Sequence, residues 1–140
     1  MTADEFIKSK AAAFAKDLAA DRLLKMKDID RQGFHRWRRE AWTFLVETGL
    51  PTKVFSVQRL TFAGTLGIPS EEHREGREAE PRRYRFGYWV VARNGRAAGR
   101  WWWAQFSPMI PPGDFEALLA KARSEGTIRN TVGTRLEGDP

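Results

Sequence analysis

The sequence predicts an α+β domain with two N-terminal helices, a small antiparallel β-sheet with a central hairpin, and a C-terminal helix packed on the sheet. Two aromatic-rich runs flank Asn94-Gly95 within residues 84–107, which is typical of a hairpin because both residues tolerate the positive φ angles of a tight turn. Helical apolar spacing and capping residues occur on either side of this segment. We assign residues 1–126 to one domain and residues 127–140, which contain few apolar side chains, to a flexible C-terminal tail.

The first helix is predicted from Thr2 to about Lys27. Thr2 and Glu5 have the spacing of a capping box, in which each side chain bonds the other residue's backbone N–H. Phe6, Phe14 and Leu18 then fall on one apolar stripe.

The second helix is predicted to begin near Phe34 and to end before Gly49. Its apolar residues recur at helical spacing: Phe34, Trp37, Ala41, Phe44 and Leu45. Cations near the start of a helix oppose its dipole, so local stability does not explain the arginines found there. Phosphate contacts would explain them, and pairing with nearby acids on a solvated surface is the alternative.

Three further elements follow from local composition. Residues 53–64 are rich in β-branched and aromatic side chains and indicate a strand. Residues 70–81 are dense in charge and indicate a mobile loop. Acidic residues at the start, basic residues at the end and Gly126 as the C-cap indicate a last helix from Asp114 to Glu125.

A two-residue hairpin loop at Asn94-Gly95 divides the strand residues between two faces of the sheet. The core face carries Tyr84, Phe86, Tyr88, Val90, Trp101 and Trp103. The other face carries Arg85, Trp89, Arg93, Arg96, Arg100 and Trp102, with Gly87 opposite Trp102 leaving room for its indole. A six-residue loop over residues 94–99 would keep this assignment, whereas an odd loop length would exchange the faces of one strand.

The net charge of +6 is concentrated in one segment. Residues 81–113 contain six arginines and no aspartate or glutamate. Such a surface attracts polyanions and acidic proteins, although arginines also serve solubility and cover apolar surface with their stems.

Side chains suited to catalysis are few. The chain has no cysteine, and its two histidines, His35 and His73, lack the spacing of a metal site. We therefore predict no catalytic residue, no metal and no cofactor, and a binding protein rather than an enzyme; a metal-dependent nuclease with scattered acids is the open alternative. No apolar run approaches a membrane span, and the N-terminus lacks the order of a signal peptide, so we expect a cytoplasmic protein that is not in a membrane.

The interleaved arginine and tryptophan side chains predict a sequence-tolerant nucleic-acid-binding protein, for single strands or duplex, because bases stack on indoles while arginines meet phosphates. The predicted contacts are Arg85, Trp89, Arg93, Arg96, Arg100 and Trp102, with Arg36, Arg38 and Arg39 as a second phosphate site. Two alternatives use the same surface: a subunit that docks an acidic protein partner, and a pocket for a small anionic ligand between the hairpin and the last helix. The prediction requires that Trp89 and Trp102 face solvent, because a helix lying over them would remove the stacking surface.

Overall fold

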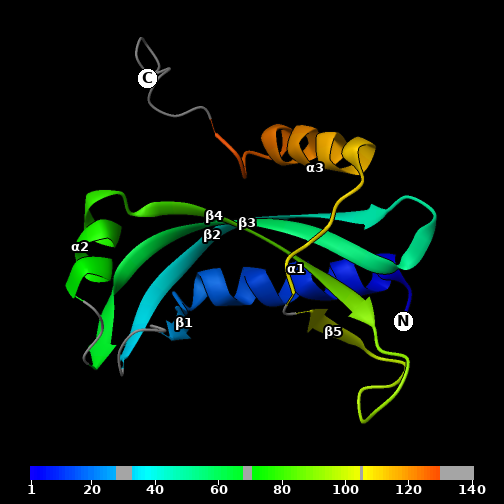
Figure 1. Ribbon diagram of the computed structural model, residues 1–140, viewed down its shortest axis with the longest axis horizontal. Helices are drawn as coiled ribbons and strands as arrows, with labels where there is room; N and C mark the ends of the chain where they lie inside the picture. Colours follow the sequence, from blue (N-terminus) through cyan, green and yellow to red (C-terminus); the bar gives the residue numbers. More distant parts are fainter. Residues whose placement is uncertain (28–32, 68–70, 105, 130–140) are drawn as a thin grey trace.

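A computed structural model describes residues 1–27, 33–67, 71–104 and 106–129. Within these residues the chain forms three helices and five strands, which confirms the α+β class (Figure 1). In chain order they are α1 (Ala3–Ala19), β1 (Leu24–Lys27), β2 (Gly33–Glu47), β3 (Leu50–Gly67), α2 (Glu71–Ala79), β4 (Arg82–Val91), β5 (Trp101–Ala104) and α3 (Pro112–Ser124).

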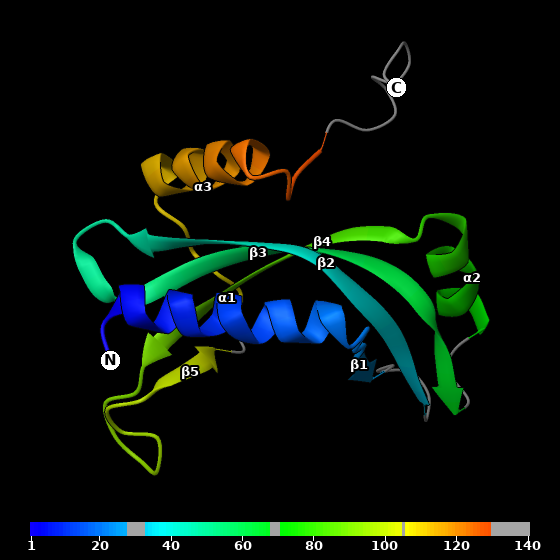
Figure 2. The same cartoon turned by 180° about the vertical axis from the view of Figure 1, so that it is seen from behind.

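The strands form one antiparallel sheet in the order β1-β2-β3-β4-β5, so each strand pairs with its neighbour in sequence. The sheet is curved: α1 lies along its concave face and α3 lies over its convex face (Figures 1 and 2). Successive strand residues therefore alternate between a face that meets α1 and a face that meets α3. The two faces carry different chemistry.

The first helix is shorter than predicted. Its capping box is confirmed, since Thr2 Oγ1 accepts from the Glu5 N–H at 3.2 Å and the Glu5 carboxylate accepts from the Thr2 N–H at 2.7 Å. The helix ends at Ala19, and Asp21 then takes a positive φ of 52°. The following residues, predicted as helix to Lys27, instead form β1 and pair with β2.

The predicted second helix is wrong, because this segment is β2. A β-bulge between Arg39 and Ala41 inserts an extra residue, so Arg39 and Trp42 lie on the same face although they are three positions apart. A second irregularity lies between His35 and Trp37. Together these bulges interrupt the period of two and produce a spacing that resembles a helix.

The strand predicted at residues 53–64 is confirmed within β3. The segment predicted as a mobile loop instead forms α2, in which Arg74 pairs with Glu78 at 3.0 Å across one turn; residue 70 lies outside the described residues. The last helix is confirmed as α3, and Gly126 follows its C-cap with φ 80°. Thr127 is buried, so the domain continues past residue 126, whereas residues 130–140 lie outside the described part.

The convex core packs α3 against the middle of the sheet. Phe55 and Val57 of β3 meet Leu118 and Ala122 of α3, and each of the four is fully buried. The first turn of α3 is held by Asp114, whose carboxylate accepts hydrogen bonds from the backbone N–H of Thr48 at 3.0 Å and from its hydroxyl at 2.6 Å.

The predicted hairpin is confirmed, but its connection and register are not as predicted. β4 ends at Val91 and β5 begins at Trp101, so the connection is the nine residues 92–100, closed by hydrogen bonds between Ala92 and Arg100 and between Gly99 and Ala92. Trp89 pairs with Trp103, Val90 with Trp102 and Val91 with Trp101. The odd loop length exchanges the two faces of β5, which places Trp101 and Trp103 on the concave face and Trp102 on the convex face.

Candidate functional site

The N-terminal half of α1 covers part of the concave face. Phe6 stacks on Trp101 with ring centroids 4.8 Å apart and contacts Trp89 at 5.2 Å, and the Trp101 indole donates to the Met1 carbonyl at 3.0 Å. Next to these contacts an open pocket of about 210 Å³ remains. Its lining residues are Arg39, Trp42, Gln58, Arg85, Trp89 and Trp103.

Two cations, Arg39 and Arg85, line this pocket, and a third, Lys10, lies beside it over the ring of Trp89. The three come from different elements, and each lies over an indole. Lys10 Nζ of α1 is 4.2 Å from the ring centroid of Trp89. The guanidinium carbon of Arg39 on β2 is 4.0 Å from that of Trp42, and the guanidinium carbon of Arg85 on β4 is 4.9 Å from that of Trp103. Cation–π attraction stabilises these charges in part but provides no counter-charge.

The positive charges of the pocket are not balanced by acids. Burial lowers the pKa of Lys10, and the charge of Arg39 lowers it further. Burial also lowers the pKa of Arg39, as does the charge of Arg85, while Asp17 partly offsets both effects; burial alone lowers the pKa of Arg85. Within the described part of the chain no carboxylate forms an ion pair with any of the three cations. An anion placed among them would relieve this repulsion.

Gly87 positions the indole that forms one wall of the pocket. A Cβ atom at Gly87 would lie 2.1 Å from Cη2 of Trp103, so the missing side chain is what lets this indole lie flat across the sheet. The indole predicted to use this space was Trp102, and the exchanged register gives the space to Trp103 instead. Arg85 and Trp103 also line an adjacent hollow of about 350 Å³.

Several buried polar atoms on this side of the sheet lack a partner. The Gln58 side-chain carbonyl accepts from Nε of Arg39 at 3.1 Å, but the indole N–H groups of Trp42 and Trp89 donate to no atom of the described residues. Unpaired buried donors are uncommon in proteins, because each costs about 1–3 kcal/mol. A ligand that carries acceptor oxygens would suit the cations that line the pocket.

The predicted nucleic-acid contacts do not lie on one face. Arg85 and Trp89 belong to the concave pocket, where Trp89 is half-buried under Phe6 and Lys10. Trp102 lies on the other face of the sheet and is 53% exposed. The remaining predicted contacts are exposed in the β4–β5 connection: Arg93, Arg96 and Arg100. The continuous arginine–tryptophan face is therefore wrong, and its members divide between two places.

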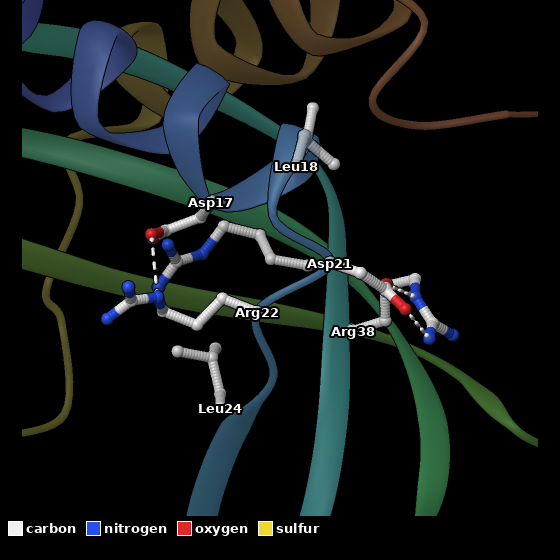
Figure 3. Close-up of a pocket in the computed structure, with 7 residues that line it drawn as sticks. Asp17, Leu18, Asp21, Arg22, Leu24 and Arg38 are labelled. Carbon is white, nitrogen blue, oxygen red and sulfur yellow. Dashed lines mark hydrogen bonds and ion pairs between the residues drawn. The ribbon is translucent and has the colours of Figure 1, made fainter.

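The residues of the predicted second phosphate site, Arg36, Arg38 and Arg39, lie on a strand and not at the start of a helix. Arg38 and Arg39 both line a small cavity at the junction of α1 and β1, and Arg39 also lines the concave pocket. Arg38 points to Asp21 at the junction of α1 and β1, where its Nε is 2.8 Å from the carboxylate (Figure 3). The hydrogen bond and charge of Arg38 lower the pKa of Asp21. The cavity at this junction measures only about 20 Å³, room for about one water molecule.

Sequence reasoning missed Trp42, Gln58 and Trp103 as members of the pocket, and it missed Lys10, which lies beside the pocket over Trp89. One signal was available for Lys10, which lies four residues after Phe6 and four before Phe14 and so falls on the apolar stripe of α1. A lysine on a buried stripe needs an explanation. Trp103 required the true register of β5, and Gln58 lies among other polar residues of β3, Ser56, Arg59 and Thr61, so it did not stand out.

Two further properties bear on function. No cluster of three or more potential metal ligands occurs among the residues that the structure describes. Of the helices in those same residues, none combines the length and the apolar character needed to cross a bilayer. Comparisons of the chain with protein-family models, with curated proteins and with solved structures gave no match.

Proposed function

We propose that this protein binds a small organic anion, with a planar apolar body, in the pocket on the concave face of the sheet. The anionic group would lie among Lys10, Arg39 and Arg85. The body would lie against the indoles of Trp42, Trp89 and Trp103. A carboxylate or a phosphate monoester of an aromatic compound has this chemistry.

One observation carries the proposal: three partly buried cations gather at and beside one pocket with no carboxylate paired to them among the described residues. In an ordinary protein interior a buried charge is paired, since leaving it unpaired costs several kcal/mol. Proteins retain such a cost at functional sites, where the ligand supplies the missing charge. The convergence of all three cations on one pocket separates this arrangement from scattered surface arginines.

The dimensions of the pocket limit the ligand. At about 210 Å³ it is smaller than the roughly 300–1,000 Å³ that accommodates a drug-sized molecule, so the ligand is a compact one. The adjacent hollow shares Arg85 and Trp103 and leaves space for a substituent. Indole walls favour a flat, unsaturated body, because offset ring stacking adds to the burial of apolar area.

Binding rather than catalysis fits the residues that line the pocket. The described lining residues include no histidine, no carboxylate and no hydroxyl to act as a base, an acid or a nucleophile. Selectivity would arise from charge, because a neutral ligand of the same shape would leave three cations desolvated and unpaired.

The proposal is tested by titrating tryptophan fluorescence with phenyl phosphate and benzoate, using benzyl alcohol as the neutral ligand of similar shape. We expect saturable quenching by both anions and none by the alcohol at the same concentration. Arg85→Gln should weaken the affinity about tenfold or more, because a hydrogen bond to a charged group is worth about 1.5–3 kcal/mol.

Arg123→Gln is the matched control, because Arg123 is an exposed arginine on α3, over the other face of the sheet. It should bind both anions as the parent does. Equal binding of benzyl alcohol, or equal losses in Arg85→Gln and Arg123→Gln, would show that the concave pocket does not select an anion.

A further inference from the structure

The connection between β4 and β5 forms a second cationic surface, separate from the concave pocket. We define the hairpin tip as residues 92–100 together with Trp102. A hollow of about 630 Å³ opens here, and its lining residues include Arg93, Arg96 and Trp102. None of these three lines the concave pocket.

The hairpin tip is internally organised. The Gly99 N–H donates to the Ala92 carbonyl at 2.8 Å, and Nη2 of Arg100 donates to the Arg96 carbonyl at 3.0 Å. Gly95 and Gly99 have φ angles of 77° and 81°, which side-chain-bearing residues rarely adopt. The connection is therefore a folded loop that holds its arginines outward.

The charge at the hairpin tip is unopposed. Arg93, Arg96 and Arg100 are exposed, and in the described ranges none of them forms an ion pair. Lys53, which pairs across the sheet with Val90, provides a contrast, because Glu47 neutralises it at 3.2 Å. The sheet thus compensates its nearby lysine and leaves the arginines of the tip available to an anionic partner.

Trp102 supplies an aromatic surface beside these arginines. Its register with Val90 places it on the convex face, and it is 53% exposed. It forms no ring contact with the rest of the described chain, in contrast to Trp101 and Trp103, which pack against Phe6 and Trp89. Its exposure in a hollow that Arg93 and Arg96 also line leaves an indole face open beside unpaired arginines.

We propose that the hairpin tip binds single-stranded nucleic acid, with one base stacked on Trp102 and the phosphates beside Arg93, Arg96 and Arg100. A base requires one exposed ring flanked by cations, and the tip provides that. A duplex would offer no free base to stack on Trp102, because its bases are already stacked on one another. An acidic protein partner would require a wider apolar centre than a single indole.

Fluorescence anisotropy of a short labelled oligothymidylate tests this proposal. With three phosphates neutralised, the affinity should fall about 20-fold between about 50 and 200 mM salt, a log–log slope near −2. Trp102→Ala should weaken binding about tenfold without changing this slope, and Trp102→Phe should retain most of the affinity. Arg96→Ala should reduce the slope by about 0.7, because one phosphate contact is lost.

Two controls keep this surface distinct from the concave pocket. Arg85→Gln and Arg123→Ala should bind the oligonucleotide as the parent does. No binding at the lower salt concentration would overturn the proposal. So would competition by poly-glutamate that is as strong as that of unlabelled oligonucleotide, or Trp102→Ala binding indistinguishable from the parent, since each result would indicate attraction to any polyanion or to an acidic protein.

Discussion

The two faces of the sheet treat buried polar groups in opposite ways. On the convex face, Arg59 donates to the Glu40 carboxylate at 2.9 Å and to the backbone carbonyls of Gly126 and Thr127. The Thr43 hydroxyl lies 2.8 Å from the Thr127 hydroxyl. Asp114 accepts both hydrogen bonds of Thr48, as described above. For these groups the partners are supplied by the protein itself.

The concave face also carries cationic side chains, but among the described residues no carboxylate pairs with them. Arg85 is half-buried and lies over the Trp103 ring with no carboxylate partner, whereas the side chain of Arg59 is 5% exposed and fully engaged. Two arginines on adjacent strands of one sheet thus have different functions. Arg59 holds the end of α3 against the sheet, and Arg85 contributes to a charge that the fold leaves open.

Removing a paired cation should have the largest effect on the free energy of unfolding. Arg59→Gln leaves Glu40 without its counter-charge and frees two buried carbonyls, so we expect a loss of about 3 kcal/mol in the free energy of unfolding. Urea denaturation followed by circular dichroism measures this. Arg85→Gln should change stability by less than about 1 kcal/mol. Equal losses in the two variants would show that the faces do not differ.

Filling the space above Gly87 should cause the next largest loss in the free energy of unfolding. Gly87→Ala places a methyl group 2.1 Å from Cη2 of Trp103, so the indole must move, and overpacking of this kind costs about 1–3 kcal/mol. The variant should also lose affinity for phenyl phosphate, because the moved indole changes the pocket wall. Gly113→Ala, where an added Cβ meets nothing within 4 Å, is the matched control.

The sequence could predict those parts of the fold that short-range signals determine. Local signals were sufficient for the start of α1 and the end of α3, because the Thr2–Glu5 capping box and Gly126 act within a few residues of the helix ends they mark. They failed at β2, because the bulge between Arg39 and Ala41 depends on pairing with β3 and leaves no distinct local pattern. Tertiary pairing there overrides the helical spacing.

The candidate site was harder to predict, because the face on which each tryptophan of β5 lies depends on whether the hairpin connection has an odd or an even number of residues. Asn94-Gly95 indicated a two-residue turn. The connection has nine residues instead, so Trp102 lies on the convex face and Trp103 on the concave face, the reverse of the prediction. Arg85 and Trp89 were assigned correctly to the same face, since they lie four residues, an even number, apart on one strand. Lys10 joins them from a distant helix, and only the fold brings these residues together.

Acid should reduce the stability that the convex face contributes. The loss should be smaller than the loss in Arg59→Gln. Burial by itself would raise the pKa of Glu40, but the hydrogen bonds of Arg59 and Thr61 and the charges of Arg59 and Arg82 together outweigh burial and hold that pKa below its ordinary value of 4.5. The folded state thus binds a proton less readily than the unfolded state, so this contribution is present above pH 4.5 and is lost as the pH falls through the lowered pKa.

Urea denaturation at a series of acidic pH values tests this contribution. The parent should lose more stability below pH 4.5 than Glu40→Gln does. Parallel pH profiles for the two proteins would show that the ion pair with Arg59 contributes nothing.

Removing an unpaired cation should change the free energy of unfolding least, and it should raise that free energy rather than lower it. Burial lowers the pKa of Lys10, so its charge destabilises the folded state at neutral pH, and stability should rise as the pH increases through that lowered pKa toward 10.5. Lys10→Met keeps the apolar stem, so we expect a gain of up to about 0.5 kcal/mol, limited by solvent screening and by the lost cation–π contact. Chemical denaturation at neutral pH measures the gain, and a loss would contradict it.

The most direct test of an open concave face uses the indole N–H signals of the six tryptophans in a two-dimensional nitrogen–proton NMR spectrum, assigned by single Trp→Phe variants. Addition of phenyl phosphate should shift the signals of Trp42, Trp89 and Trp103 and leave Trp37 and Trp102 in place. Shifts confined to Trp102, or no shift in any indole up to saturating ligand, would contradict the account.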